Sequence, residues 1–173
     1  MPVFALPMPA LLTLFSFSIR LGDALLWGLF STGVLTLVMA ASQGLGWSRM
    51  SFPFMIGSVF TTRRPRAMAL GFIAHVLFGC VFALLYVAMF ERWQDASWWL
   101  GGLLGSYHGL FILVAIMPVL PVLHPHMASR QHGPTPTRQL EPPGFLALNY
   151  GRSTPVVTLL AHVVYGVLLG VLY

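Results

Sequence analysis

Four long apolar runs divide the sequence, and none of them carries a charged residue near its middle. They extend over approximately Gly22 to Ser42, Ala67 to Phe90, Ser97 to Leu120 and Pro155 to Tyr173. Each has about the 20 residues that an α-helix needs to cross the hydrocarbon core of a bilayer. Only 8% of the 173 residues are charged, whereas about a quarter are charged in a typical soluble domain. The sequence therefore predicts an all-α integral membrane protein, a single domain (residues 1–173) built as a four-transmembrane-helix bundle.

The segment before the first run is apolar but contains several prolines. It covers Met1 to Ser18 and has neither a basic region at its start nor a clear cleavage site, so a cleaved signal peptide is not expected. Its unbroken part is shorter than a membrane span. We expect an N-terminal segment at the membrane interface, with a fifth span as the alternative.

The distribution of arginine predicts the orientation. All nine basic residues are Arg, and seven lie in the two long loops: Arg49, Arg63, Arg64, Arg66, Arg130, Arg138 and Arg152. The short link around Arg92 is net negative. The positive-inside rule then places both long loops in the cytoplasm and the C-terminus outside, which we expect to be across a bacterial inner membrane. The net charge of +5 thus indicates topology, and no nucleic-acid partner is expected.

Parts of the second and fourth runs have similar sequences. Residues 74–86 (AHVLFGCVFALLY) and 161–173 (AHVVYGVLLGVLY) are identical at six of thirteen positions. We interpret this as a duplication, with tandem two-helix units at about residues 20–90 and 97–173. Both units would cross in the same direction, as a parallel repeat about a pseudo-two-fold axis along the membrane normal. We then expect the second and fourth spans to meet near that axis, with His75 facing His162.

The first unit resembles a family of small prokaryotic membrane proteins of unknown function that have a His-x3-Gly transmembrane motif. The residues that carry the resemblance are Gly33, Thr36 and Met39, then Pro53, Met55 and Gly57, then His75, Gly79, Ala83 and Tyr86. The resemblance covers about half of the chain, and the second half would be a divergent copy. It implies the fold and no particular activity.

Small residues recur at four-residue spacing around the membrane histidines. The three stripes are Gly71, His75, Gly79 and Ala83; Thr158, His162, Gly166 and Gly170; and Gly101, Gly105 and Gly109, with His108 beside them. Residues four apart share one helix face, and small residues there let membrane helices approach closely. Helix packing is therefore the first expectation, with neutral histidines hydrogen-bonded to neighbouring helices.

The same histidines allow two other interpretations. A neutral imidazole is an axial ligand of haem iron and, by the same chemistry, of chlorophyll magnesium. His75 and His162 are thus candidate tetrapyrrole ligands, although few charges are available for haem propionates. A small transporter is the third interpretation, and the lack of a carboxylate or Arg within the spans weakens it.

The long loops supply two further sets of candidates. His124, His126 and His132 form a weak candidate metal site, and an interfacial turn is the stronger expectation for them. Aromatic residues of both loops are candidates for docking a partner protein: Phe52, Phe54, Phe60, Phe145 and Tyr150.

No nucleophile motif or phosphate-binding glycine loop occurs in the sequence, and no enzymatic function is expected. The chain has almost no mass outside its spans. We therefore expect a small membrane subunit that packs against and stabilises a larger complex. The complex we expect is an energy-transducing one, respiratory or photosynthetic. The alternative is an electron-transfer protein that binds haem or chlorophyll.

Overall fold

The computed structural model describes residues 20–129, 133–136 and 140–173, which are helical and contain no β-strand. Within these residues, four stretches are long and apolar enough to cross a membrane: α2 (Leu21–Gly44), α4 (Arg64–Trp93), residues 98–123 and α7 (Thr154–Leu172). Their ends lie within three residues of the predicted ones, so the four predicted spans are confirmed. The predicted N-terminal interfacial segment, with its alternative of a fifth span, lies outside the described residues.

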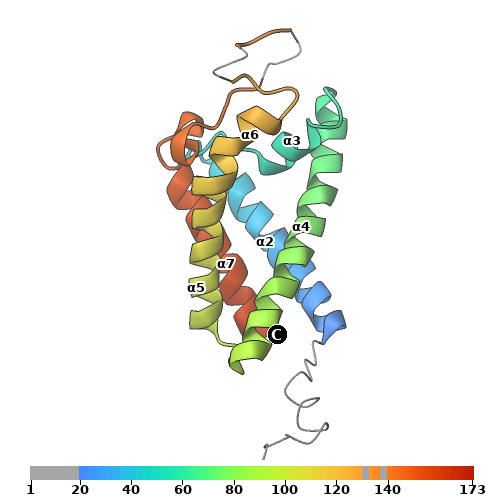
Figure 1. Cartoon of the computed structure of the whole chain (residues 1–173), viewed down its shortest axis with the longest axis vertical. Helices are drawn as coiled ribbons and strands as arrows, with labels where there is room; N and C mark the ends of the chain where they lie inside the picture. The colour runs from blue at the N-terminus through green and yellow to red at the C-terminus, as the bar shows by residue number, and fades with distance from the viewer. Residues whose placement is uncertain (1–19, 130–132, 137–139) are drawn as a thin grey trace, which may run out of the picture.

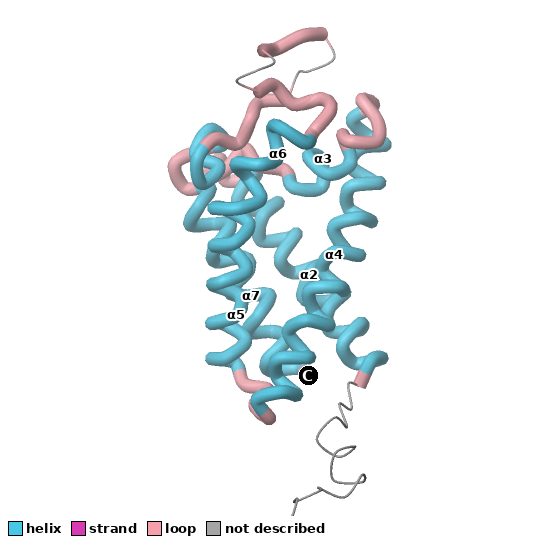
Figure 2. Tube along the Cα trace, in the orientation of Figure 1, coloured by secondary structure: helices cyan, strands magenta, loops and turns pink. Residues whose placement is uncertain are grey.

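The spans run alternately up and down, so both long loops lie at one end of the bundle. Two short helices occupy these loops, α3 (Phe52–Gly57) and the 3-10 helix η2 (Phe145–Tyr150). Figure 1 shows α3 and α6 at this end, and the C-terminus at the other end with the α4–α5 link. The tube in Figure 2 shows the same separation of loops from spans. We refer to the two ends as the loop end and the Tyr173 end.

The two long loops bond to each other across the loop end. The backbone N–H of Arg49 donates to the Tyr150 carbonyl at 2.7 Å. The hydroxyls of Ser48 and Thr154 are 2.9 Å apart, and Arg49 pairs with Glu141 at 3.3 Å. Residues 48–49 therefore tie the first long loop to the second long loop and to the start of α7.

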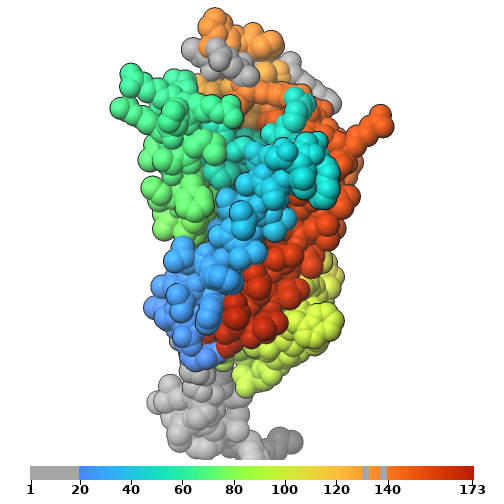
Figure 3. All heavy atoms as spheres, turned by 180° about the vertical axis from the view of Figure 1, so that it is seen from behind, coloured from blue at the N-terminus to red at the C-terminus, as the bar shows by residue number. Residues whose placement is uncertain are grey.

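The spans do not pack with equal contact. α2 packs against α4 and α7, and α5 (Trp98–Phe111) packs most extensively against α7. From behind, Figure 3 shows α2 and α7 side by side. In contrast, α4 and α7 touch only slightly, and α4 and α5 barely meet. The second and fourth spans, which we expect to meet near the repeat axis, therefore touch over a small area only, because most of the contact surface of α7 packs against α5 and α2.

Glycines make the α5–α7 contact possible. A Cβ added at Gly101 would collide with the carbonyl of Gly166, and a Cβ added at Gly166 with the carbonyl of Gly101. Gly105 lies in the same way against the carbonyl of His162. On the other side of the bundle, a Cβ at Gly79 would collide with the side chain of Thr32. Backbones can approach this closely only where side chains are absent.

The third span contains an irregularity that we did not predict. Between α5 and α6 (Met117–Leu123) lies a π-helical segment, η1 (Ile112–Ile116). Pro118 follows it and has no N–H to continue the helical ladder, and π-helical turns commonly occur at such places. η1 widens the span next to the cavity described below.

Candidate functional site

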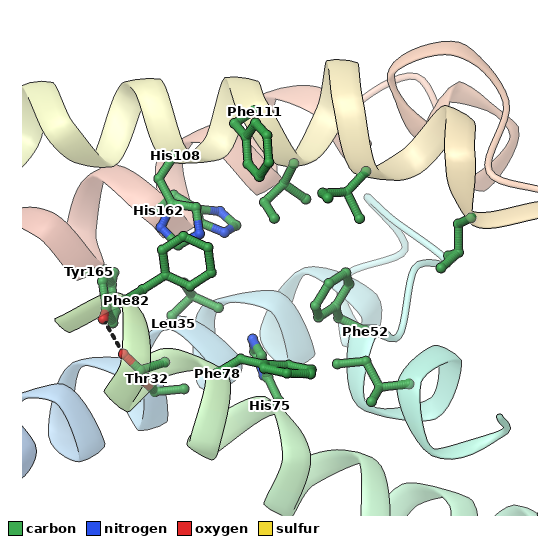
Figure 4. A pocket seen from close by; sticks show the side chains of 15 residues that line it. Thr32, Leu35, Phe52, His75, Phe78, Phe82, His108, Phe111, His162 and Tyr165 are labelled. Carbon is green, nitrogen blue, oxygen red and sulfur yellow. Dashed lines mark hydrogen bonds between the residues drawn. The ribbon is translucent and has the colours of Figure 1, made fainter. Parts of the chain in front are cut away.

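A cavity of about 320 Å³ lies between α4 and α5, in front of α2 and α7. Figure 4 shows side chains from these four helices, and Phe52 of α3, around one space. The lining residues are Thr32, Leu35, Phe52, Ile56, His75, Phe78, Gly79, Phe82, His108, Phe111, Ile112, Ile116, Leu120, His162 and Tyr165. None of them carries a formal charge at neutral pH with histidine neutral, so the site is apolar apart from three imidazoles and two hydroxyls.

The cavity is partly open, and its mouth is formed by two phenylalanines. Phe78 of α4 is 52% exposed and Phe111 of α5 is 49% exposed, and both belong to the cavity lining. Both also lie within helices long and apolar enough to span a membrane. An exposed side chain at that position contacts lipid, so the cavity opens sideways toward the bilayer.

The proton position on His75 follows from its neighbour Thr36. The Thr36 hydroxyl donates its one proton to the Thr32 carbonyl at 2.8 Å and lies 3.2 Å from His75 Nδ1. We assign the imidazole proton of His75 to Nδ1, because the shorter contact to Thr32 uses the one proton of the Thr36 hydroxyl and leaves its oxygen to accept from His75. In a neutral ring Nε2 then carries a lone pair, and no described residue donates to it.

His162 has the same tautomer for a different reason. Its Nδ1 lies 2.7 Å from the carbonyl oxygen of Thr158, and a carbonyl can only accept. Nδ1 therefore carries the proton, and Nε2 keeps its lone pair. With no carboxylate in the cavity lining, a neutral imidazole is the form that apolar surroundings favour.

His108 lies beside His162 and completes the polar part of the cavity. The two rings are 4.7 Å apart between centroids, and the ring of Phe82 stacks on His108 at 3.9 Å. His108 Nδ1 is 3.3 Å from the Tyr86 hydroxyl, and either atom can be the donor in that pair. Unlike Nε2 of His75 and His162, Nε2 of His108 can therefore be either a donor or an acceptor.

A small recess of about 10 Å³ adjoins the cavity and is lined by both His75 and His162. Thr158 also lines this recess. Its side chain is 1% exposed, and its hydroxyl has no hydrogen-bond partner. A buried hydroxyl without a partner costs free energy, so this atom is a candidate contact for a ligand.

The structure brings the predicted membrane histidines together around the cavity, and not within a direct contact between two helices. His75, His108 and His162 all line the cavity, and they come from α4, α5 and α7. Gly79 lines the same cavity, whereas Gly166 lies in the α5–α7 contact. The hydrogen-bonding partner Thr36 was not predicted; its only signal was its place in the Gly33-Thr36-Met39 pattern.

The loop histidines that the structure describes have other partners. His124 Nε2 donates to the Met55 carbonyl at 2.9 Å, and His124 Nδ1 accepts from the backbone N–H of His126 at 3.1 Å. His126 Nδ1 donates to the Ser58 carbonyl at 2.6 Å. Among the described residues no three metal-binding side chains cluster, and His132 lies outside them.

The aromatic loop residues proposed for docking divide into two groups. Phe52 lines the cavity beside the ring of His75. Tyr150 is 8% exposed, and its hydroxyl donates to the Glu141 carbonyl at 2.5 Å; burial raises the pKa of this phenol to about 12. Tyr150 is thus buried within the protein, and Phe52 is half-buried. Phe60 and Phe145 are exposed, and Phe54 is half-buried under Arg64.

The size and chemistry of the cavity do not fit a tetrapyrrole well. An apolar cavity of about 150 Å³ holds one benzene, so four pyrrole rings need roughly four times that volume by the same measure. The cavity has about 320 Å³. None of its lining residues is Arg, so it also offers no cation for haem propionates.

Comparisons of the chain with protein-family models, curated proteins and solved structures give no match.

Proposed function

We propose that this protein is a non-enzymatic membrane protein that binds a small apolar molecule taken from the bilayer. The observation that carries the proposal is the cavity of about 320 Å³ between α4 and α5. Its mouth lies among lipid-facing side chains, and its polar atoms lie at the inner end. Sites for small molecules have this composition, a mostly apolar lining with a few polar groups that orient the ligand.

The role of a subunit in a larger membrane complex is a second candidate, and one feature of α4 favours it. This span is the least covered of the four, with 22% of its most apolar window buried inside the chain. A helix of another protein seated on α4 would also cover the mouth of the cavity. Such a partner would remain bound in a mild detergent and appear in native mass spectrometry of the purified protein.

We also propose that the chain arose by duplication of a two-helix unit. Two features support this. α2 and α5 cross in one direction and α4 and α7 in the other (Figure 1), and each half carries a short helix in its long loop. The halves have diverged, because α3 is a regular helix whereas η2 contains left-handed residues at Leu146 and Ala147.

A photoreactive apolar probe tests the binding function directly. A phenyl diazirine dissolved in the bilayer should label Phe82, which is half-buried in the cavity lining. Ile116→Trp would fill the cavity, because Ile116 lines it. We expect this variant to reduce labelling of Phe82 several-fold and to leave labelling of the lipid-facing Val81 unchanged.

The matched control is Val114→Trp, on the same π-helical segment. Val114 is 50% exposed and is not part of the lining, so the control adds the same ring outside the cavity. Equal labelling of Phe82 in both variants would contradict the proposal. An absorption spectrum of the purified protein with a Soret band at stoichiometric yield would instead favour tetrapyrrole binding.

A further inference from the structure

The polar inner end of the cavity presents an unusual set of atoms to a ligand. His75 and His162 both hold their proton on Nδ1, through Thr36 and the Thr158 carbonyl. Each therefore offers a lone pair at Nε2. The Thr158 hydroxyl is buried and without a partner, beside both histidines in the small recess. The recess, whose lining does not include His108, thus has two fixed acceptors and one hydroxyl that can both donate and accept.

This set favours a ligand that donates a proton. A ligand carbonyl oxygen carries lone pairs and no proton. Opposite Nε2 of a neutral His75 or His162, it would face a second lone pair and could form no hydrogen bond. A ligand hydroxyl can donate to Nε2 and accept from Thr158 at the same time. The recess has about 10 Å³, about the volume that one water occupies by this measure, so a single hydroxyl group fits it.

The remaining lining favours a flat ring. Phe52, Phe78, Phe82 and Phe111 supply aromatic surfaces in the cavity, and aromatic rings pack against one another in stacked or edge-to-face geometry. The cavity volume of about 320 Å³ is about twice the volume that holds one benzene. It is therefore enough for a substituted ring with a short piece of chain. A longer apolar tail would leave between Phe78 and Phe111 into the lipid.

We propose that the ligand is a lipid-soluble hydroquinone (a quinol with an apolar tail), whose ring hydroxyl enters the recess formed by Thr158, His75 and His162. This inference rests on the proposed binding function and adds the ligand class. It concerns binding alone. The site prefers the reduced form, because the oxidised quinone offers carbonyl oxygens where the protein already offers acceptors.

The test measures binding of three related molecules to the full chain in nanodiscs. They are a decyl-substituted benzoquinol kept reduced with dithionite, the corresponding quinone, and the dimethyl ether of the quinol, which cannot donate. Affinity is read from competition with the photolabel at Phe82. We expect the quinol to bind about tenfold more tightly than either of the other two molecules. This difference corresponds to the loss of one hydrogen bond to a buried acceptor.

Two variants locate the hydroxyl contact. Thr158→Val keeps the shape and removes an oxygen that has no partner in the protein, so we expect normal folding and roughly three- to tenfold weaker quinol binding. Ser31→Ala is the matched control. Its hydroxyl is also fully buried and unpartnered, but Ser31 does not line the cavity, and quinol binding should not change.

The outcomes separate this inference from the proposed function. If all three molecules compete equally, and Ile116→Trp abolishes competition by each, the cavity binds apolar rings and the preference for a hydroquinone is wrong. If Thr158→Val binds the quinol as tightly as Ser31→Ala does, the recess is not the hydroxyl site. If no molecule competes with the label, both the inference and the proposed function fail.

Discussion

Both ring nitrogens of His124 are used within the protein. Nε2 donates to the Met55 carbonyl, and Nδ1 accepts from the N–H of His126. If Nδ1 of His124 were protonated, it would become a donor facing the N–H of His126, and the hydrogen bond between them would break. Burial lowers the pKa of His124, the bond to Met55 opposes this effect, and the neighbouring His126 adds to it. The neutral ring thereby holds the end of α3 against the start of the second long loop.

The first prediction follows from the sign of this shift. A folded-state pKa below the unfolded one means that the unfolded state binds the proton more readily. The contribution of His124 is therefore complete above the ordinary histidine value of about 6.5 and is lost as the pH falls below it. As the pH falls from about 7.5 to about 5, we expect the protection factors of the α3 amides, corrected for the intrinsic pH dependence of hydrogen exchange, to fall more than those of the α2 amides.

His124→Gln provides the control for this prediction. The amide side chain has one donor and one acceptor, as the neutral imidazole does, but it does not titrate. The protection factors of the α3 amides in this variant should depend less on pH than in the wild type. The same pH dependence in both proteins would show that a group other than His124 controls this corner.

The sequence revealed the polar residues of the candidate site but not their chemistry. His75, His108 and His162 stood out because glycines and other small residues recur at four-residue spacing around them. Which nitrogen carries the proton depends on Thr36, which lies 39 positions from His75 in the chain and on another helix. The place of Phe52 in the cavity lining and the burial of Tyr150 also depend on tertiary contacts, which the sequence pattern does not reveal.

At the scale of helices, the α5–α7 contact depends on glycine more than any other contact does. Gly101, Gly105, Gly166 and Gly170 each leave no space for a Cβ, and each meets backbone atoms of the opposite helix. Backbone atoms cannot rotate away as a side chain can. A substitution here must therefore move one helix relative to the other.

The second prediction compares two Gly→Ala changes. Gly166→Ala should destabilise the bundle by roughly 1–3 kcal/mol, the usual cost of overpacking. Gly33→Ala should be neutral or slightly stabilising, because nothing lies within 4 Å of its added Cβ and alanine favours helix over glycine. The measurement is the midpoint of unfolding as SDS is added to the protein in mild detergent, followed by tryptophan fluorescence. A similar midpoint for both variants would show that the α5–α7 contact tolerates separation.

Hydropathy predicted the four spans well because membrane crossing depends on the length and polarity of a segment alone. The partners of each span depend on which faces pack, and apolar sequences do not specify that. The duplication suggested that α4 would meet α7, but the glycines on α5 and α7 fit each other more closely. The π-helical segment was missed although Pro118 and Pro121 lie at the end of that run.

At the scale of the whole molecule, the bundle has one closed side and one open side. α2 and α7 close the back (Figure 3), and α4 and α5 stand apart at the front with the cavity between them. α4 is held mainly by α2 and α3. One further bond joins it to α7, in which the Tyr165 hydroxyl donates to the Gly79 carbonyl at 2.6 Å. Entry of the proposed ligand from the bilayer would therefore require no separation of the closely packed α5–α7 pair.

The two ends of the bundle differ in charge, and this difference is the basis of the third prediction. Within the described residues, the loop end carries Arg49, Arg63, Arg64, Arg66 and Arg152 with one acid, Glu141. The Tyr173 end carries Arg20 and Arg92 with Asp23, Glu91 and Asp95. A cytoplasmic loop end agrees with the positive-inside rule, and exposed Trp93, Trp98 and Trp99 suit the opposite interface.

Single cysteines at the two ends test this orientation, in a Cys80→Ser background because Cys80 is the only native cysteine. Phe60→Cys marks the loop end and Trp98→Cys the Tyr173 end; both native side chains are well exposed, at 67% and 65%. In intact bacterial spheroplasts, a membrane-impermeant maleimide should label Trp98→Cys and not Phe60→Cys. In inside-out vesicles the pattern should reverse. Labelling of Phe60→Cys in spheroplasts would invert the orientation and leave the mouth of the cavity unchanged, since the mouth faces the lipid in either case.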